Sequence, residues 1–290
     1  MSSSTPAPRA SFSSWLGERL SLLNYFLRHS GSVASGWRMF YLGVLKRSFV
    51  HRGLAKHRGE RVHEVTFKPG GDACWRLRLR DNQLDAGVLV EFFAQGRLTE
   101  FERLQPSPRV IYDLGANIGV ASLMMARGCP DAEVVAFEPE PGNFKLCEFN
   151  LKNLPRATVF PLAVGRECGS LTFEVSGDDL RGGRLANTAE STGGRHTRRF
   201  IVEVWSVAEL VAKKKIPSPD LLKVDVEGAE MDVLNGLGGC VRGVRYIHLE
   251  THSDELERRC TAWLDANGFK IESREDYGPG LAALWAVRKG

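Results

Sequence analysis

The chain has 290 residues, of which 43% are hydrophobic, and carries a formal net charge of +4, so it is long enough to bury a full α/β core. No apolar run approaches the roughly 20 residues of a transmembrane helix, and we therefore expect a soluble, cytoplasmic protein. The six cysteines form no C-x-x-C pair, which argues against a disulfide framework or a zinc site and fits reduced thiols.

Residues 1–62 are strongly basic, with ten Lys or Arg against two Glu, a charge of +8. Such a segment can lie on an anionic membrane or bind RNA, or it can form a solvated helical layer that packs through its aromatic side chains. We favour the helical layer and keep peripheral contact with an anionic membrane as the alternative. Nucleic acid is not expected, because no RNA-binding motif is present. The serine-rich, acid-free residues 1–16 also fit a transit peptide.

A hairpin is predicted next, because residues 64–68 and 73–80 flank the turn-forming residues 69–72. Arg76, Arg78 and Arg80 alternate with apolar residues, which predicts a basic ridge that faces solvent. We place a domain boundary after residue 84, so that residues 1–84 form an N-terminal extension and residues 85–290 form the catalytic domain.

The first motif follows a short apolar strand at residues 110–112 and precedes a helix expected at residues 118–127. Here the strand ends at Asp113 and the chain turns through glycines, a pattern that builds a small-molecule cradle at the edge of a parallel sheet. A dinucleotide fingerprint would have glycine at positions 117 and 120, where this chain has Asn and Val. Since pyrophosphate avoids a nearby anion, Asp113 favours a ligand with an ammonium group, such as S-adenosylmethionine.

A second strand, residues 134–137, ends at Glu138. An acidic residue at this place, about 20 residues beyond the glycine turn, binds the ribose hydroxyls of an adenosine. NAD and S-adenosylmethionine share that ribose, so Glu138 supports an adenosine site and the choice between them rests on the turn.

Alternating strands and helices continue, as a parallel sheet requires. We expect a helix at residues 143–154, a strand at 157–160, and an added hairpin of residues 171–175 and 200–204. The loop between the hairpin strands, residues 177–199, is long and basic, and it either covers an anionic acceptor or is an ordinary surface excursion. Ser206 and Glu209 form a capping box for a helix that ends near Pro217.

The strand at residues 221–224 delivers Asp225, Glu227 and Glu230 to the same sheet edge. Three carboxylates in six residues repel one another unless a positive group lies among them, and a sulfonium, a metal ion or a substrate would satisfy that need. Alternatively, Glu227 and Glu230 only favour a helix N-terminus through its dipole, which leaves Asp225 unexplained.

A further strand at residues 244–249 ends in Glu250 and His252, and a terminal antiparallel pair is expected from residues 268–271 and 281–287. A histidine beside a carboxylate has a suitable pKa, about 6.5, to accept a hydroxyl proton. The alternative is a packing or capping residue, which a lone histidine at a loop mouth often is.

Four motifs together resemble the FkbM family of S-adenosylmethionine-dependent methyltransferases. They are DLGANIG at residues 113–119, FEPEP at 137–141, LAVG at 162–165 and KVDVEGAE at 223–230. The resemblance implies an α/β, doubly wound, seven-strand class I methyltransferase (Rossmann-like) sheet that uses S-adenosyl-L-methionine, and O-methylation of a hydroxyl on a sugar, glycan, lipid or polyketide-type acceptor. Residues 1–84 have no counterpart in it.

The same resemblance implies roles for individual residues. The cofactor-binding set would be Asp113, Gly115, Asn117 and Gly119 on the methionine part, Glu138 on the ribose, and Ala163 of the third motif. Asp225 and Glu227 would line the mouth of the methyl-transfer site.

Several groups can take the acceptor proton. His252, Glu250 or Asp225 accepts it directly, or a divalent ion held by Asp225, Glu227 and Glu250 lowers the pKa of the hydroxyl; the sequence alone assigns no metal ligand. Two other function classes remain: an NAD-dependent oxidoreductase, disfavoured by the missing glycines, and a non-catalytic docking protein that binds membrane or RNA, disfavoured by the intact motifs.

Overall fold

The computed structural model describes residues 12–45, 61–70, 73–94, 99–176, 184–185 and 197–290. The chain divides into two compact units, Met1–Arg97 and Leu98–Gly290, whereas the domain boundary after residue 84 stays a prediction. Among the described helices, none combines the length and the apolar character that a membrane span requires.

The described part of the first unit contains helices and a hairpin, the kinds of element expected for the N-terminal extension. Its elements are α1 (Phe12–Arg28), α2 (Val33–Phe40), the π-helical turn η1 (Tyr41–Leu45), β1 (Val62–Gly70), β2 (Ala73–Arg80), α4 (Gln83–Leu89) and the π-helical turn η2 (Val90–Ala94).

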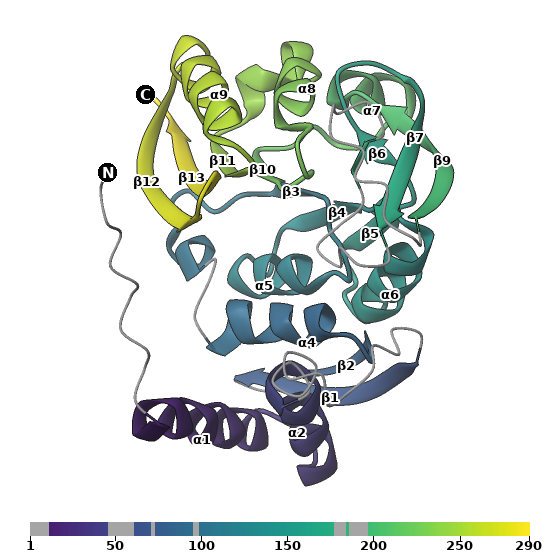
Figure 1. The fold of residues 1–290 in the computed structure, drawn as a ribbon. Helices are drawn as coiled ribbons and strands as arrows, with labels where there is room; N and C mark the ends of the chain where they lie inside the picture. The colour runs from purple at the N-terminus through teal and green to yellow at the C-terminus, as the bar shows by residue number, and fades with distance from the viewer. Residues whose placement is uncertain (1–11, 46–60, 71–72, 95–98, 177–183, 186–196) are drawn as a thin grey trace, which may run out of the picture. The chain divides into compact units, whose positions relative to one another are not determined.

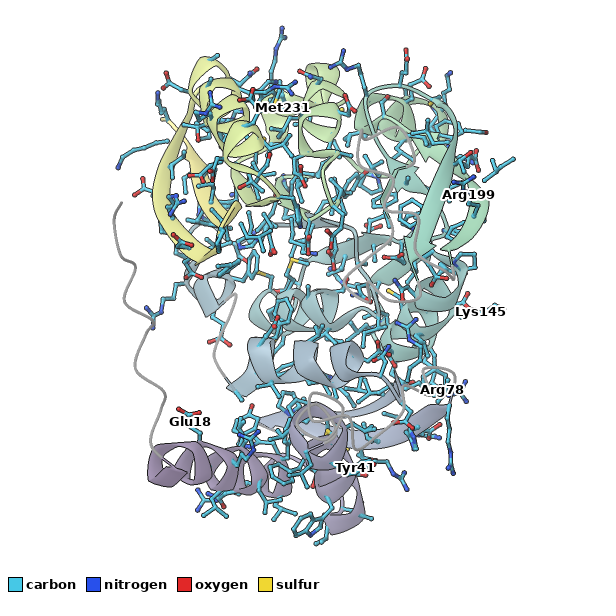
Figure 2. All side chains as sticks on the ribbon, viewed as in Figure 1. Glu18, Tyr41, Arg78, Lys145, Arg199 and Met231 are labelled. Carbon is cyan, nitrogen blue, oxygen red and sulfur yellow. The ribbon has the colours of Figure 1, made fainter. Side chains whose placement is uncertain are left out.

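The hairpin of β1 and β2 has the alternation that the sequence predicts. Leu77 and Leu79 are buried while Arg76 and Arg78 are exposed, and Figure 2 shows Arg78 at the surface. The third arginine of the predicted ridge differs, because Arg80 Nη2 lies 2.9 Å from Oδ1 of the buried Asp85. Arg80 therefore joins β2 to α4 instead of facing solvent.

The second unit holds the predicted catalytic sheet. Its strands are β3 (Val110–Leu114), β4 (Glu133–Phe137), β5 (Ala157–Phe160), β6 (Ala163–Val164), β7 (Gly169–Ser176), β8 (Arg184–Leu185), β9 (Thr197–Trp205), β10 (Leu221–Val224), β11 (Tyr246–Thr251), β12 (Phe269–Gly278) and β13 (Leu281–Arg288). Its helices are η3 (Thr99–Arg103), α5 (Val120–Gly128), α6 (Pro141–Leu151), α7 (Val207–Lys213), α8 (Glu230–Asn235), η4 (Gly238–Gly243) and α9 (Asp254–Ala266).

Seven strands form the main sheet in the order β12-β13-β11-β10-β3-β4-β5. The five strands from β11 to β5 run parallel, and β13 is antiparallel to both β11 and β12. This is the doubly wound arrangement with a terminal antiparallel pair that we expected. The order reverses between β3 and β10, and in such sheets ligands bind at this reversal.

Helices cover both faces of this sheet. In Figure 1, α5 and α6 lie on one side of the parallel strands, and α7, α8 and α9 lie on the other. The main core gathers apolar residues of the central strands with those of α7, α8 and α9, among them Tyr112, Val224, Leu234 and Leu264. The strands are buried on both faces, which explains why β10 reads as an almost continuous apolar run.

Several boundaries differ from the expected ones. The second helix, α6, begins at Pro141 instead of residue 143, because Pro suits the first helical turn and Glu140 accepts a hydrogen bond from the amide of Asn143. Strand β11 continues to Thr251, so Glu250 lies within the strand, paired with Ala283 of β13. The helix capped by Ser206 already ends at Lys213.

The added hairpin is part of a small sheet with the order β6-β9-β7-β8. It has an apolar cluster of its own, Phe173, Val202 and Val204. Most of the basic loop expected at residues 177–199 lies outside the described residues.

The glycine turn after β3 depends on a very close approach of two backbones. Gly115 has a φ of +81°, and a Cβ on it would lie 1.8 Å from the carbonyl oxygen of Asp225. We therefore expect Gly115→Ala to lower the free energy of unfolding by about 3 kcal/mol or more, since left-handed strain and overpacking each cost about 1–3 kcal/mol.

Urea denaturation of purified protein measures this loss. Gly169→Ala is the matched control, because no atom beyond its two chain neighbours lies within 4 Å of its added Cβ, and we expect a change within about 0.5 kcal/mol. Equal stability of the two variants would contradict the close approach.

Candidate functional site

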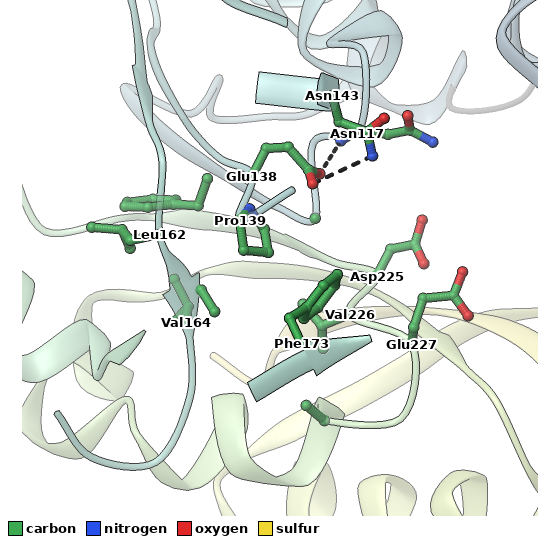
Figure 3. A pocket seen from close by; sticks show the side chains of 14 residues that line it. Asn117, Glu138, Pro139, Asn143, Leu162, Val164, Phe173, Asp225, Val226 and Glu227 are labelled. Atoms are coloured by element: carbon green, nitrogen blue, oxygen red, sulfur yellow. Dashed lines mark hydrogen bonds between the residues drawn. The ribbon is translucent and has the colours of Figure 1, made fainter. Parts of the chain in front are cut away.

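A cavity of about 670 Å³, mouth included, opens at the carboxyl edge of β3, β4 and β10. We call it the sheet-edge cavity, and Figure 3 shows Glu138 on one side of it and the carboxylates of Asp225 and Glu227 on another. Its lining consists of Gly115, Asn117, Phe137, Glu138, Pro139, Asn143, Leu162, Ala163, Val164, Phe173, Asp225, Val226, Glu227 and Ala229. Apolar walls with a few polar groups are typical of a cofactor site.

Glu138 organises one end of this cavity. Its Oε2 accepts a hydrogen bond from the backbone amide of Asn117 at 2.7 Å, and its Oε1 accepts one from the amide of Glu140 at 2.9 Å. Burial raises the pKa of Glu138 to about 7, although the hydrogen bonds from Glu140, Asn117 and Asn143 act in the opposite direction. The predicted ribose ligand therefore also holds the glycine turn in place.

Asp113 does not reach the sheet-edge cavity. It is fully buried in β3, where its Oδ1 lies 3.1 Å from Lys223 Nζ and its Oδ2 accepts a hydrogen bond from Ser122 Oγ at 2.6 Å. We expected a positively charged ligand as the partner of Asp113, and this expectation is wrong, because the partner is a lysine of the neighbouring strand.

Lys223 joins three parts of the site. Besides Asp113, its ammonium lies 3.3 Å from Asp225 Oδ2 and donates to the carbonyl oxygen of Gly115 at 3.1 Å. Burial alone would lower the pKa of Lys223, but the charges of Asp113 and Asp225 outweigh burial and raise it above the usual value. From the sequence, Lys223 belonged to a predicted strand and began the fourth motif, but no partner was predicted for its charge.

The other predicted cofactor residues divide into two groups. Gly115, Asn117, Glu138 and Ala163 line the sheet-edge cavity. Gly119 does not, because it is the left-handed N-cap of α5, with a φ of 86°.

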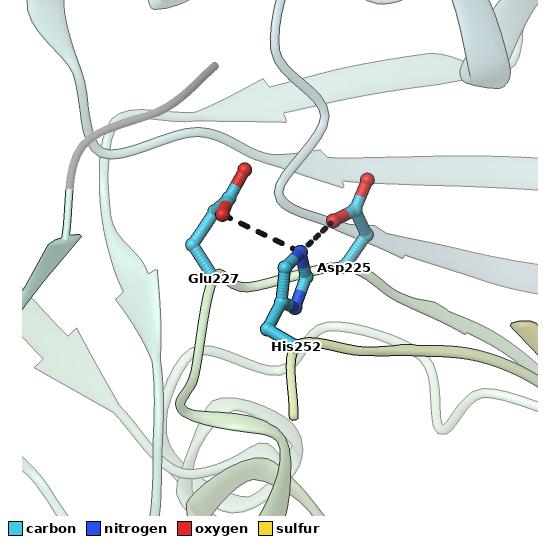
Figure 4. A group of neighbouring side chains, drawn as sticks. All are labelled: Asp225, Glu227 and His252. Carbon is cyan, nitrogen blue, oxygen red and sulfur yellow. Dashed lines mark ion pairs between the residues drawn. The ribbon is translucent and has the colours of Figure 1, made fainter. Parts of the chain in front are cut away.

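The predicted catalytic residues come together in part. Asp225, Glu227 and His252 form a carboxylate–histidine group, in which Nε2 of His252 lies 3.7 Å from Asp225 Oδ1 and 3.4 Å from Glu227 Oε2. Figure 4 shows the imidazole between the two carboxylates. Glu250 is not a member of this group.

The buried Glu230 fixes the imidazole of His252. Its Oε1 lies 2.7 Å from Nδ1 of His252 and accepts a hydrogen bond from the amide of Gly228 at 2.9 Å. Burial lowers the pKa of His252, but the hydrogen bond to Glu230 and the charges of Glu227 and Asp225 outweigh burial and raise it to about 9. The raised pKa favours the imidazolium form at neutral pH, which disfavours the predicted role of His252 as the direct proton acceptor.

Backbone conformation shapes the same region. Asn117 and Glu227 both have left-handed backbone angles, with φ values of 50° and 53°. For residues other than glycine such angles cost about 1–3 kcal/mol and cluster at functional sites. Both side chains line the sheet-edge cavity.

Comparison with known proteins places this site in context. Residues 113–271 match the methyltransferase FkbM domain. Hexuronic acid methyltransferase AglP of Haloferax volcanii is 32% identical over 175 residues, covering 58% of this chain and 68% of AglP. The 2-O-methyltransferase NoeI of Sinorhizobium fredii is 30% identical over 162 residues, covering 52% of this chain and 66% of NoeI.

Among solved structures, TrmK of M. capricolum in complex with S-adenosylhomocysteine aligns with a TM-score of 0.42 and 10% identity. The alignment covers 67% of this chain and 68% of TrmK.

The ion pairs of Lys223 give a stability prediction. Lys223→Met leaves the fully buried Asp113 without its cation and removes the cation beside one oxygen of Asp225. We expect a loss of about 3–5 kcal/mol of unfolding free energy, as for other broken buried pairs. Adding Asp113→Asn should recover part of the loss. Urea denaturation measures both variants.

Arg274→Met serves as the control, because Arg274 and Glu257 form a surface pair with the arginine side chain 46% exposed. Such pairs contribute about 1 kcal/mol or less. A loss for Lys223→Met as small as that of Arg274→Met would show that the buried lysine is dispensable.

Proposed function

The chain belongs to the FkbM family of S-adenosylmethionine-dependent methyltransferases, and we propose that it methylates a hydroxyl oxygen of a sugar, glycan, lipid or polyketide-type acceptor. Glu138 alone does not distinguish NAD from S-adenosylmethionine, because both contain an adenosine. Membership of the family identifies the cofactor as S-adenosylmethionine. One observation carries the proposal: Asp225 and Glu227 belong both to the wall of the sheet-edge cavity and to the carboxylate–histidine group.

The residues present fit S-adenosylmethionine in the sheet-edge cavity. Glu138 and Asn143 offer an acceptor and a donor for the ribose, and Leu162, Val164 and Phe173 offer apolar surface for the adenine. Asp225 and Glu227 give the opposite wall a negative charge that suits a sulfonium. When bound, the cofactor supplies a methyl group on a positively charged sulfur.

Gly115 and Asn117 are proposed to hold the methionine part, as the family motif implies. Both line the cavity. Asp113 and Gly119 are proposed to support the cofactor site without touching the cofactor. Asp113 acts through its ion pair with Lys223, and Gly119 begins α5 behind the glycine turn.

Charge at the acceptor side favours a neutral hydroxyl over a carboxylate. Asp225, Glu227 and the nearby Glu230 already concentrate negative charge around His252. A carboxylate acceptor would add another anion at this place, which costs free energy, whereas a hydroxyl donates a hydrogen bond to either carboxylate. The chain's residues then act mainly by positioning the acceptor oxygen in line with the methyl group.

The activity named for NoeI supports this proposal. NoeI is a 2-O-methyltransferase and AglP acts on a hexuronic acid. A hexuronic acid offers both hydroxyls and a carboxylate, so the bond formed has to be determined directly.

An acceptor screen with product analysis tests the proposed reaction. Protein is incubated with S-adenosylmethionine and a panel of sugars, uronic acids and hydroxylated lipids, and products are analysed by mass spectrometry before and after mild alkali. We expect a methyl ether, which survives alkali. A product that alkali cleaves is a methyl ester and would refute methylation of a hydroxyl.

The cofactor is tested separately by thermal unfolding. We expect S-adenosylhomocysteine to raise the melting temperature while NAD at the same concentration leaves it unchanged, because only a bound ligand stabilises the folded state. The reverse result would favour the oxidoreductase.

The carboxylate of Glu138 should make the affinity for S-adenosylhomocysteine depend on pH. The pKa of about 7 in the folded protein means that the carboxylate gains its charge between about pH 6 and pH 8, and ribose hydroxyls bind the charged form better. Affinity for S-adenosylhomocysteine should therefore rise with pH in this window, by at most about tenfold per pH unit. Titration calorimetry measures the slope.

Glu138→Gln should bind more weakly and lose the slope. Glu148→Gln is the control, because Glu148 is exposed on the same helix that follows Glu138, and it should keep the slope. A slope that persists in Glu138→Gln would assign the pH dependence to another group.

A further inference from the structure

The carboxylate–histidine group has the geometry of three ligands around one small cation. Single oxygen or nitrogen atoms of Asp225, Glu227 and His252 all lie within 4.8 Å of one another, and His252 Nε2 is 3.4 Å from Glu227 Oε2 and 3.7 Å from Asp225 Oδ1. Two ligand atoms bound to one ion at about 2.1 Å lie roughly 3.0–3.5 Å apart, depending on the coordination angle. Small side-chain shifts therefore suffice to close this group around an ion.

Glu230 holds His252 as metal-bound histidines are usually held. The Nδ1 atom of His252 is bound to a carboxylate with 0% exposure, and this directs Nε2 toward the two other carboxylates. Metal-binding histidines commonly donate their second ring nitrogen to such a carboxylate, which fixes the tautomer and the ring orientation.

The buried carboxylate of Glu230 is only partly satisfied by hydrogen bonds. Oε2 of Glu230 is buried and accepts no hydrogen bond within the described part of the chain, so His252 Nδ1 and the Gly228 amide are the donors that stabilise this carboxylate. A cation on Nε2 would make Nδ1–H a stronger donor and would stabilise the buried charge further.

Negative charge exceeds positive charge around the group. The ion pairs described here join four carboxylates, those of Asp113, Asp225, Glu227 and Glu230, to Lys223 and His252. Four carboxylates and one ammonium give these groups a formal charge of −3 with a neutral imidazole and −2 with a protonated one. A divalent cation would remove most of this excess.

We propose that Asp225, Glu227 and His252 bind a divalent metal ion, with Glu230 as the positioning residue behind His252. The ligand set of two carboxylates and one imidazole suits Mn²⁺ or Zn²⁺, because carboxylates accommodate the former and imidazole the latter. Three protein ligands leave coordination positions open, as in catalytic metal sites. The set differs from the ion site expected from sequence, in which Glu250 took the place of His252.

The metal gives the acceptor hydroxyl a binding place at the cavity wall. An oxygen bound to the ion has a lowered pKa and gives up its proton more readily to solvent or to a neighbouring carboxylate. This role rests on the proposed methylation of a hydroxyl, whereas the binding of the ion itself does not.

Binding of Mn²⁺ in the absence of any methyl donor tests the site. Full-length protein is freed of metal with a chelator, and free Mn²⁺ is followed by electron paramagnetic resonance during titration. We expect a single saturable site in the wild type, no binding at this site in His252→Gln or Glu227→Gln, and about 10- to 100-fold weaker binding in Glu230→Gln, as is typical for a residue behind a ligand.

Glu255→Gln is the matched control. Glu255 is an exposed carboxylate on α9 that pairs with Arg258, and its variant should bind Mn²⁺ like the wild type. Saturation by Zn²⁺ in competition with Mn²⁺ should follow the same pattern across the variants.

Affinity for S-adenosylhomocysteine shows whether each variant is folded. His252 does not line the sheet-edge cavity, so metal-free His252→Gln should keep the wild-type affinity for this ligand. Absence of Mn²⁺ and Zn²⁺ binding by the wild type, or binding unchanged in His252→Gln, overturns the proposal. The metal site is supported if the wild type binds the metal and a folded His252→Gln variant does not. This result would support the metal site even if no hydroxyl is methylated.

Discussion

The ion pair between Asp113 and Lys223 underlies the rest of the site. Two adjacent parallel strands each place a charged side chain on the same face of the sheet, in direct register, and neither is exposed to more than a few per cent. Because a buried charge is stable only with a partner, the pair fixes the register of β3 against β10. The glycine turn and Asp225 follow directly from these two strands, so their positions depend on it.

Lys223 also determines which negative charges remain available to a ligand. It neutralises Asp113 and contacts one oxygen of Asp225. Asp225 Oδ1 and the carboxylate of Glu227 instead lie near His252. From the sequence we expected the negative charge of the site at the glycine turn, on Asp113. In the structure the carboxylates available to a ligand are those of Asp225 and Glu227, which follow β10. A sulfonium and a divalent cation, the two positive groups proposed for this site, would both be attracted to that side.

The sequence was sufficient to predict the main sheet and to identify the residues at the ends of its strands. Strand ends at Glu138 and Asp225 can be recognised because apolar runs stop there, and both residues line the cavity. The partners of charged residues were harder to recognise. Lys223 interrupts an apolar strand by a single residue, and only the pairing of β10 with β3 shows that it meets Asp113. The contact of Glu230 with His252 spans 22 residues, and no local spacing predicts it.

The order of the strands explains why the cavity and the carboxylate–histidine group share two residues. One end of the cavity is formed by residues that follow β3 and β4, while His252 follows β11 on the far side of β10. The segment after β10 lies between these two regions, so Asp225 and Glu227 are the residues that face both. In the proposed reaction, a methyl group delivered from the cavity would meet an acceptor oxygen held near His252 beside this segment. Its left-handed backbone at Glu227 and Gly228 turns the chain there and keeps both carboxylates at that boundary.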